Sequence, residues 1–137
     1  MTHWNKVLLV DAINTTLNYI NQETKEIAVS NLKQNKELLD KVQSLPIRKI
    51  VVTNAPADLI KNALHGYDFE VFSCNNDPSK VEPEFYANFL EHYNLNPQDC
   101  SYFDHKQANI DSAKQVGING VLFENNDQVM AYFSEMM

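Results

Sequence analysis

The sequence of 137 residues is poor in the residue types that mark several protein classes. It has only two cysteines, Cys74 and Cys100, without a CxxC spacing, which argues against a disulfide framework or a thiolate metal site. Three glycines, five prolines and no biased tract are not the composition of a fibrous or disordered chain. The sequence is that of a globular protein, and its length predicts a single domain over residues 1–137.

Positive charge and long apolar runs are also scarce. Eighteen acidic residues against eleven basic ones give a formal charge of −7, and Arg48 is the only arginine. A basic face that follows a phosphate backbone is therefore not expected, and we predict no nucleic-acid partner. The N-terminus lacks a basic segment followed by an apolar one, so we expect a cytoplasmic protein without a membrane partner.

Short apolar runs alternate with helical patterns along the chain. The runs at 6–11, 48–53 and 100–104 are typical of strands that are buried on both faces. Shorter strands are expected near 70–73 and 118–123, with helices over 57–64, 84–93, 107–115 and 128–136. This alternation predicts an α/β protein, a three-layer α/β/α Rossmann-like fold around a parallel sheet of about five strands.

The stretch between the first two long strands has a weaker pattern. Residues 17–25 fit either a short hairpin or an irregular flap. Over residues 26–45, apolar residues from Ile27 to Leu45 fit one face of a helix, and Pro46 marks its end. Trp4, just before the first strand, is expected to pack over an edge of the sheet.

Polar side chains stand at the ends of the three long strands. Asp11, Thr53 and Asp104 each close an apolar run. The ligand crevice of a parallel sheet lies at the carboxyl ends of its strands, so these residues indicate a functional site at that edge.

These residues, in this order, resemble the sequence motifs of the haloacid dehalogenase (HAD) superfamily. The first motif, a strand followed by Asp-x-Asp-x-Thr, is matched by Asp11 and Thr15, but Ile13 replaces the second aspartate. The second motif, a strand ending in Thr or Ser, is matched by Thr53 and the following Asn54.

The later motifs extend the resemblance over nearly the whole chain. Lys80 matches the third motif, a lysine before a helix. Asp104 matches an acidic residue of the fourth motif, in which His105 stands where a second acid is common, and Asn109 also fits. The stretch between Asp11 and Thr53 has room for only one helix and a short flap, so the resemblance implies a capless member.

The resemblance implies a phosphohydrolase that uses Mg²⁺ and a phosphorylated small molecule. Asp11 would be the nucleophile, and Mg²⁺ would be held by Asp11, by the backbone carbonyl of Ile13 and by Asp104. Thr53, Asn54 and Lys80 would bind the phosphoryl group, with Thr53 and Lys80 also taking part in catalysis.

Ile13 leaves two functions open. In phosphatases of the family the missing aspartate protonates the leaving alcohol and activates water, which isoleucine does not do. One hypothesis is therefore a weak or slow phosphatase, and the other is an inactive HAD-fold protein retained for binding or for interaction with a protein partner. His105 is either a substitute acid or metal ligand, or a partly exposed histidine without a catalytic role.

Overall fold

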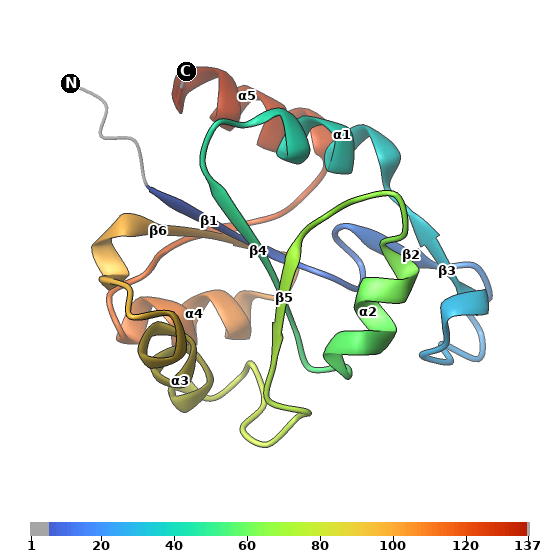
Figure 1. The fold of residues 1–137 in the computed structure, drawn as a ribbon, viewed down its shortest axis with the longest axis horizontal. Coiled ribbons are helices and arrows are strands. Elements are labelled where there is room, and N and C mark those ends of the chain that lie inside the picture. The colour runs from blue at the N-terminus through green and yellow to red at the C-terminus, as the bar shows by residue number, and fades with distance from the viewer. Residues whose placement is uncertain (1–5, 137) are drawn as a thin grey trace.

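The computed structural model describes residues 6–136, and a five-stranded sheet forms its centre (Figure 1). The strand order is β5–β4–β1–β6–β7, and every neighbouring pair is parallel. The strands are β1 Val7–Asp11, β4 Arg48–Thr53, β5 Glu70–Ser73, β6 Cys100–Asp104 and β7 Asn119–Leu122. Because all strands run the same way, their carboxyl ends meet at one edge of the sheet, with β1 in the middle.

Helices cover both faces of this sheet. In Figure 1, α1 and α5 lie together on one side, and α3 and α4 lie on the other. The helices are α1 Lys36–Ser44, α2 Ala57–Ala63, α3 Pro83–Tyr93, α4 Gln107–Gln115 and α5 Asn126–Met136, with short 3-10 turns η1 Val29–Asn31 and η2 Pro97–Asp99. The predicted three-layer α/β/α Rossmann-like fold is confirmed.

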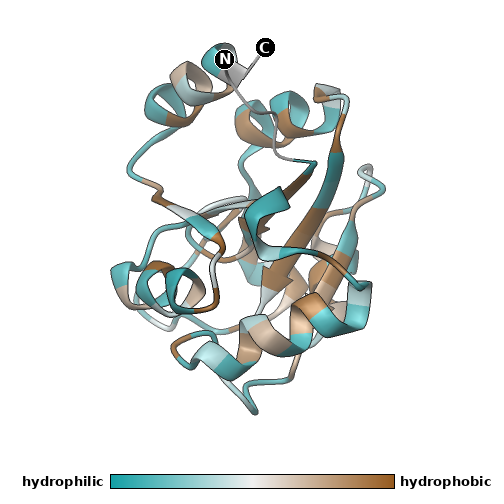
Figure 2. Cartoon of the chain, turned by 90° about the vertical axis from the view of Figure 1, so that its left-hand side faces the viewer, coloured by the Kyte–Doolittle hydropathy of each residue, from teal (hydrophilic) through white to brown (hydrophobic). Residues whose placement is uncertain are grey.

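The alternation of side chains along β1 explains why its sequence is apolar throughout. Leu8 and Val10 belong to a core cluster with buried residues of α1, α2 and α5, whereas Val7 and Leu9 belong to a second cluster with α3 and α4. All four side chains are buried. In Figure 2 the central strands are mainly brown, the colour of hydrophobic residues. A strand covered on both faces needs apolar residues at odd and even positions.

The helix expected over residues 26–45 is wrong in its first half. Residues 17–34 form a hairpin instead, in which β2 Leu17–Tyr19 pairs antiparallel with β3 Leu32–Gln34. The helix begins only at Lys36, because the side chain of Asn35 accepts a hydrogen bond from the Leu38 backbone N–H and caps it. Ile27 is 46% exposed, so its helical spacing relative to the core residues was coincidental.

The connection between β1 and β4 consists of this hairpin and α1, so the described residues hold no inserted cap at that point. A single domain for the whole protein stays a prediction, and Trp4 lies outside the described residues. Across residues 6–136, no helix combines the length and the apolar character needed to cross a membrane.

Candidate active site

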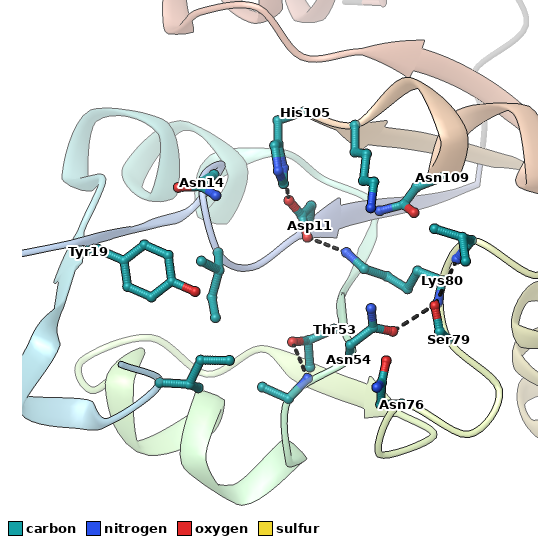
Figure 3. A pocket seen from close by; sticks show the side chains of 15 residues that line it. Asp11, Asn14, Tyr19, Thr53, Asn54, Asn76, Ser79, Lys80, His105 and Asn109 are labelled. Carbon is teal, nitrogen blue, oxygen red and sulfur yellow. Dashed lines mark hydrogen bonds and ion pairs between the residues drawn. The ribbon is translucent and has the colours of Figure 1, made fainter. Parts of the chain in front are cut away.

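Two buried carboxylates and one buried ammonium form the centre of the candidate site. Asp11 ends β1 and Asp104 ends the neighbouring β6, and they are 2% and 0% exposed. The Nζ of Lys80, itself buried, donates to Asp11 Oδ1 (Figure 3). It also donates to Asp104 Oδ2 at 2.9 Å. A lone charge buried in this way is very unfavourable, so the three groups depend on one another.

Lys80 comes from the segment between β5 and α3, and two neighbours fix its backbone. Its N–H donates to Asn54 Oδ1 at 2.8 Å, and its carbonyl accepts from the Tyr86 hydroxyl at 2.8 Å. Asn54, predicted to bind substrate, thus also holds the segment that carries the lysine. The structure places Asn54 directly after β4.

The pKa values of the buried groups reflect this mutual contact. Burial alone would lower the pKa of Lys80, but Asp11 and Asp104 outweigh it, and the net shift is upward. Burial alone would raise the pKa of Asp104, but hydrogen bonds and charge from His105, Lys80 and Tyr102 lower it overall. At neutral pH the lysine is therefore protonated and Asp104 is ionised.

His105 follows Asp104 and contacts both carboxylates. Its Nδ1 lies 2.7 Å from Asp11 Oδ2 and 3.3 Å from Asp104 Oδ1, and 35% of its side chain is exposed. Hydrogen bonds to Asp104 and Asp11 raise the pKa of His105 to about 9. The imidazole is thus part of the carboxylate cluster, although its chemical role stays a prediction.

A pocket of about 410 Å³ opens over these groups. Thr53 lines it from the end of β4, and its Oγ1 accepts a hydrogen bond from the Ala55 N–H at 3.0 Å, so its hydroxyl hydrogen can be donated. The structure brings the sequence-predicted residues Asp11, Ile13, Thr53, Asn54, Lys80, His105 and Asn109 to the pocket wall. Asp104 is fully buried and contacts Lys80 and Asn109 of that wall. The wall comprises Asp11, Ile13, Asn14, Tyr19, Ile27, Thr53, Asn54, Ala55, Asn76, Ser79, Lys80, Val81, His105, Lys106 and Asn109.

The cluster contains two carboxylates, whose oxygens are ligand atoms of the kind that a hard cation prefers. Asp11, Asp104 and His105 each offer one ligand atom, and these atoms lie within 4.8 Å of one another. The Oδ1 of Asn109 is buried and has no hydrogen-bond partner among the described residues, so it can accept a hydrogen bond from a water at this site. Carboxylate oxygens beside an unsatisfied acceptor fit Mg²⁺, which keeps several waters when bound.

Sequence reasoning placed Thr15 and Asn109 in the family motifs without giving them a role, and it missed Tyr102. The structure shows that all three support the two carboxylates. Thr15 Oγ1 donates to Asp11 Oδ2 at 2.9 Å, and Asn109 Nδ2 donates to Asp104 Oδ2 at 3.0 Å. The Tyr102 hydroxyl donates to the same oxygen of Asp104. Tyr102 precedes Asp104 by two positions on β6, and side chains two apart share a face of a strand, which was the available signal.

Comparison with known proteins agrees with this geometry. A family profile described as haloacid dehalogenase-like hydrolase matches residues 2–123. The chain belongs to this family. The resemblance to the HAD superfamily that the motifs indicated is thereby confirmed.

Two curated proteins are similar in sequence. Flavin mononucleotide hydrolase 1 of Arabidopsis thaliana is 33% identical over 64 residues, which cover 47% of this chain and 26% of that protein. A phosphorylated carbohydrates phosphatase of Thermotoga maritima is 27% identical over 129 residues, covering 85% of this chain and 60% of the relative. The chain thus spans less than two thirds of either relative.

Solved structures of HAD proteins share the fold. A HAD family enzyme of Bacteroides thetaiotaomicron aligns with a TM-score of 0.75 and 14% identity, covering 95% of this chain and 99% of that one. A HAD-superfamily hydrolase of Ehrlichia chaffeensis aligns with a TM-score of 0.72 and 16% identity, with 99% of both chains covered. At these identities the likeness supports the fold alone.

Proposed function

We propose that the protein hydrolyses phosphate monoesters with Mg²⁺, slowly, and that Asp11 is its nucleophile. The observation that carries the proposal is that Asp11, Thr53 and Lys80 line one pocket at the carboxyl edge of the sheet, with Asp104 in contact with Lys80. Phosphatase relatives, and structures of the Bacteroides thetaiotaomicron enzyme in complex with magnesium and inorganic phosphate, support this reaction class.

The residues divide the chemistry as follows. A carboxylate oxygen of Asp11 attacks phosphorus, the ester bond breaks, and an aspartyl phosphate forms, which water then hydrolyses. Lys80 offsets negative charge at the nucleophile, and Thr53 donates a hydrogen bond to a phosphoryl oxygen. Asp11, Asp104 and the carbonyl of Ile13 would hold Mg²⁺, which supplies charge neutralisation for the phosphoryl oxygens.

Ile13 explains why turnover should be slow. In this family an aspartate at that position acts as general acid and base, a role worth roughly 10²–10⁴-fold in rate. The Ile13 side chain lines the pocket and packs on the core, so an apolar group stands where that proton donor would be.

Ile13 also favours the second candidate, an inactive HAD-fold protein that binds a phosphorylated ligand or a protein partner. Such a protein would keep the buried Asp11–Lys80–Asp104 cluster for stability and binding. The two candidates differ in whether phosphate is released.

The test is phosphate release from a panel of phosphorylated metabolites with Mg²⁺. Wild type and Asp11→Asn are compared with Asp68→Asn, a control that removes an exposed carboxylate from the loop before β5, at the opposite end of the strands. We expect slow release by wild type and by the control, and none by Asp11→Asn. The Ile13→Asp variant is measured in the same assay, and phosphate release by this variant alone would establish the inactive alternative. Phosphate release that Asp11→Asn does not reduce would refute the proposed nucleophile.

A further inference from the structure

The pocket wall opposite the charged cluster is apolar. Ile13, Tyr19 and Ile27 line it from the hairpin side, and Ala55 lines it from the segment after β4. Figure 3 shows the Tyr19 ring pointing into the pocket from that side. Asp11 is the only carboxylate among the lining residues, so this wall offers no aspartate or glutamate that could protonate a leaving group.

A second cavity of about 630 Å³ continues from this wall. Ile27, Asn54, Ala55 and Asn76 line both cavities, so the two are contiguous. The remaining lining residues of the second cavity are Pro56, Leu59 and Asn75, and none of its lining residues is charged. The leaving group of a phosphate bound beside Asp11 can therefore extend onto an uncharged, largely apolar surface.

We propose that the substrates of this site are aryl phosphates, that is, phosphate monoesters of an aromatic hydroxyl. This inference rests on the proposed function and specifies its substrate class. An aromatic ring gains free energy from contact with the Ile27 and Leu59 wall, because its apolar surface leaves water. A phenolate is also a stabilised anion, so its departure does not need the proton that the missing aspartate would have given.

The reaction balances without a further reactant. The Asp11 oxygen forms a bond to phosphorus while the bond from phosphorus to the aryl oxygen breaks, and the electron pair leaves on the phenolate, which takes a proton from solvent. Water then attacks phosphorus, the bond from phosphorus to Asp11 breaks, and its carboxylate is restored. The products are a phenol and inorganic phosphate.

The first arm of the test varies the leaving group. The ratio kcat/KM is measured with Mg²⁺ for substituted phenyl phosphates of decreasing phenol acidity and for an alkyl phosphate, with wild type and Ile13→Asp. We expect the wild-type rate to fall steeply as the phenol becomes less acidic. Ile13→Asp should speed the alkyl phosphate by roughly 10²–10⁴-fold and the most acidic phenol little.

The second arm tests the apolar wall with two isoleucines of the hairpin segment. Ile27 and Ile20 are 46% and 62% exposed, so serine at either position leaves the core intact, but only Ile27 lines the cavities. Ile27→Ser should raise KM for phenyl phosphates roughly three- to tenfold, since part of a large apolar contact is lost. Ile20→Ser should leave KM unchanged.

The outcomes separate this inference from the function on which it rests. If wild type hydrolyses alkyl and aryl phosphates equally fast, the phosphohydrolase stands and the aryl class is refuted, because another side chain, such as His105, then protonates the leaving group. An unchanged KM in Ile27→Ser also refutes it. If neither wild type nor Ile13→Asp releases phosphate from any ester, the proposed function fails and the inference with it.

Discussion

The buried ionic cluster depends on each of its three residues. Lys80 is the cation between Asp11 and Asp104, and all three side chains are at most 5% exposed. Removing one member leaves buried charge without its partner, which is much more unfavourable than losing a surface ion pair. Stability and the proposed catalysis therefore depend on the same atoms.

We predict that Lys80→Met lowers the free energy of unfolding by about 3–5 kcal/mol in the presence of a chelator, because two carboxylates lose their buried counter-charge. Urea unfolding measures this. Lys61→Met, which removes an exposed lysine from α2, should change stability by less than about 0.5 kcal/mol. If Lys80→Met also changed stability by less than about 0.5 kcal/mol, Asp11 and Asp104 would not both be ionised in the folded protein.

Tyr102→Phe tests the support of Asp104. The substitution removes only the hydroxyl that donates to Asp104 Oδ2, inside a fully buried site. We expect a loss of about 1.5–3 kcal/mol in unfolding free energy, typical of a hydrogen bond to a charged group. Tyr132→Phe is the control, since its ring keeps its edge contact with Phe103, and equal losses in the two variants would argue against a specific role of the Tyr102 hydroxyl.

At the scale of elements, the strands were predictable and the hairpin was not. Strands covered on both faces produce continuous apolar runs, such as 7–11 and 100–104, that few other structures need. The hairpin over 17–34 is covered on one face only, and its exposed Ile27 imitates a helical position. The polar residues at the strand ends were predictable as well, because each directly follows or closes one of these apolar runs. The apolar wall of the pocket was not predictable from the sequence, because it joins residues that are distant in sequence.

Asn35 links the hairpin to the helix that follows. Its side chain caps α1, donates to the Thr15 carbonyl at 3.0 Å and contacts Asn126 of α5. We expect Asn35→Ala to lower the unfolding free energy by about 1–2 kcal/mol and to speed hydrogen exchange of β3 amides, since the cap and its ties are lost together. Faster exchange in α4 alone would contradict this assignment.

The outer strand pair carries a pH-dependent contact. Arg48 of β4 makes two hydrogen bonds to Glu70 of β5, at 2.8 and 2.7 Å, and lies over the Tyr93 ring. The hydrogen bond from Arg48 is the main cause that lowers the pKa of Glu70. A lowered carboxylate pKa stabilises the fold above its ordinary value of 4.5, and this contribution disappears as the pH falls through the lowered value.

We therefore predict that Glu70→Gln lowers the unfolding free energy by about 0.2–1 kcal/mol at neutral pH, because the pair is exposed and screened by solvent. The difference from wild type should disappear as the pH falls through the lowered pKa of Glu70. Urea unfolding at several pH values tests this. A difference that grows on acidification would have the wrong sign for this pair.

At the scale of the whole molecule, the fold gathers groups from four strand ends and one hairpin at a single edge of the sheet. The charged half of the pocket suits a phosphoryl group, and the apolar half suits a leaving group. Ile13 lies on the apolar half, so the residue that we propose to slow catalysis also extends the apolar surface. The sequence identified the charged half through its motifs, but the joining of the two halves required the structure.

The most direct test of the account is whether Asp11 becomes phosphorylated. Intact-mass measurement after mixing the protein with Mg²⁺ and an aryl phosphate with an acidic phenol would detect the aspartyl phosphate. We predict that the aspartyl phosphate accumulates in wild type, because Ile13 does not activate the water that hydrolyses it. A smaller amount is expected in Ile13→Asp, and none in Asp11→Asn. A wild-type protein that binds Mg²⁺ but is never phosphorylated would contradict the account and leave the fold as a binding protein.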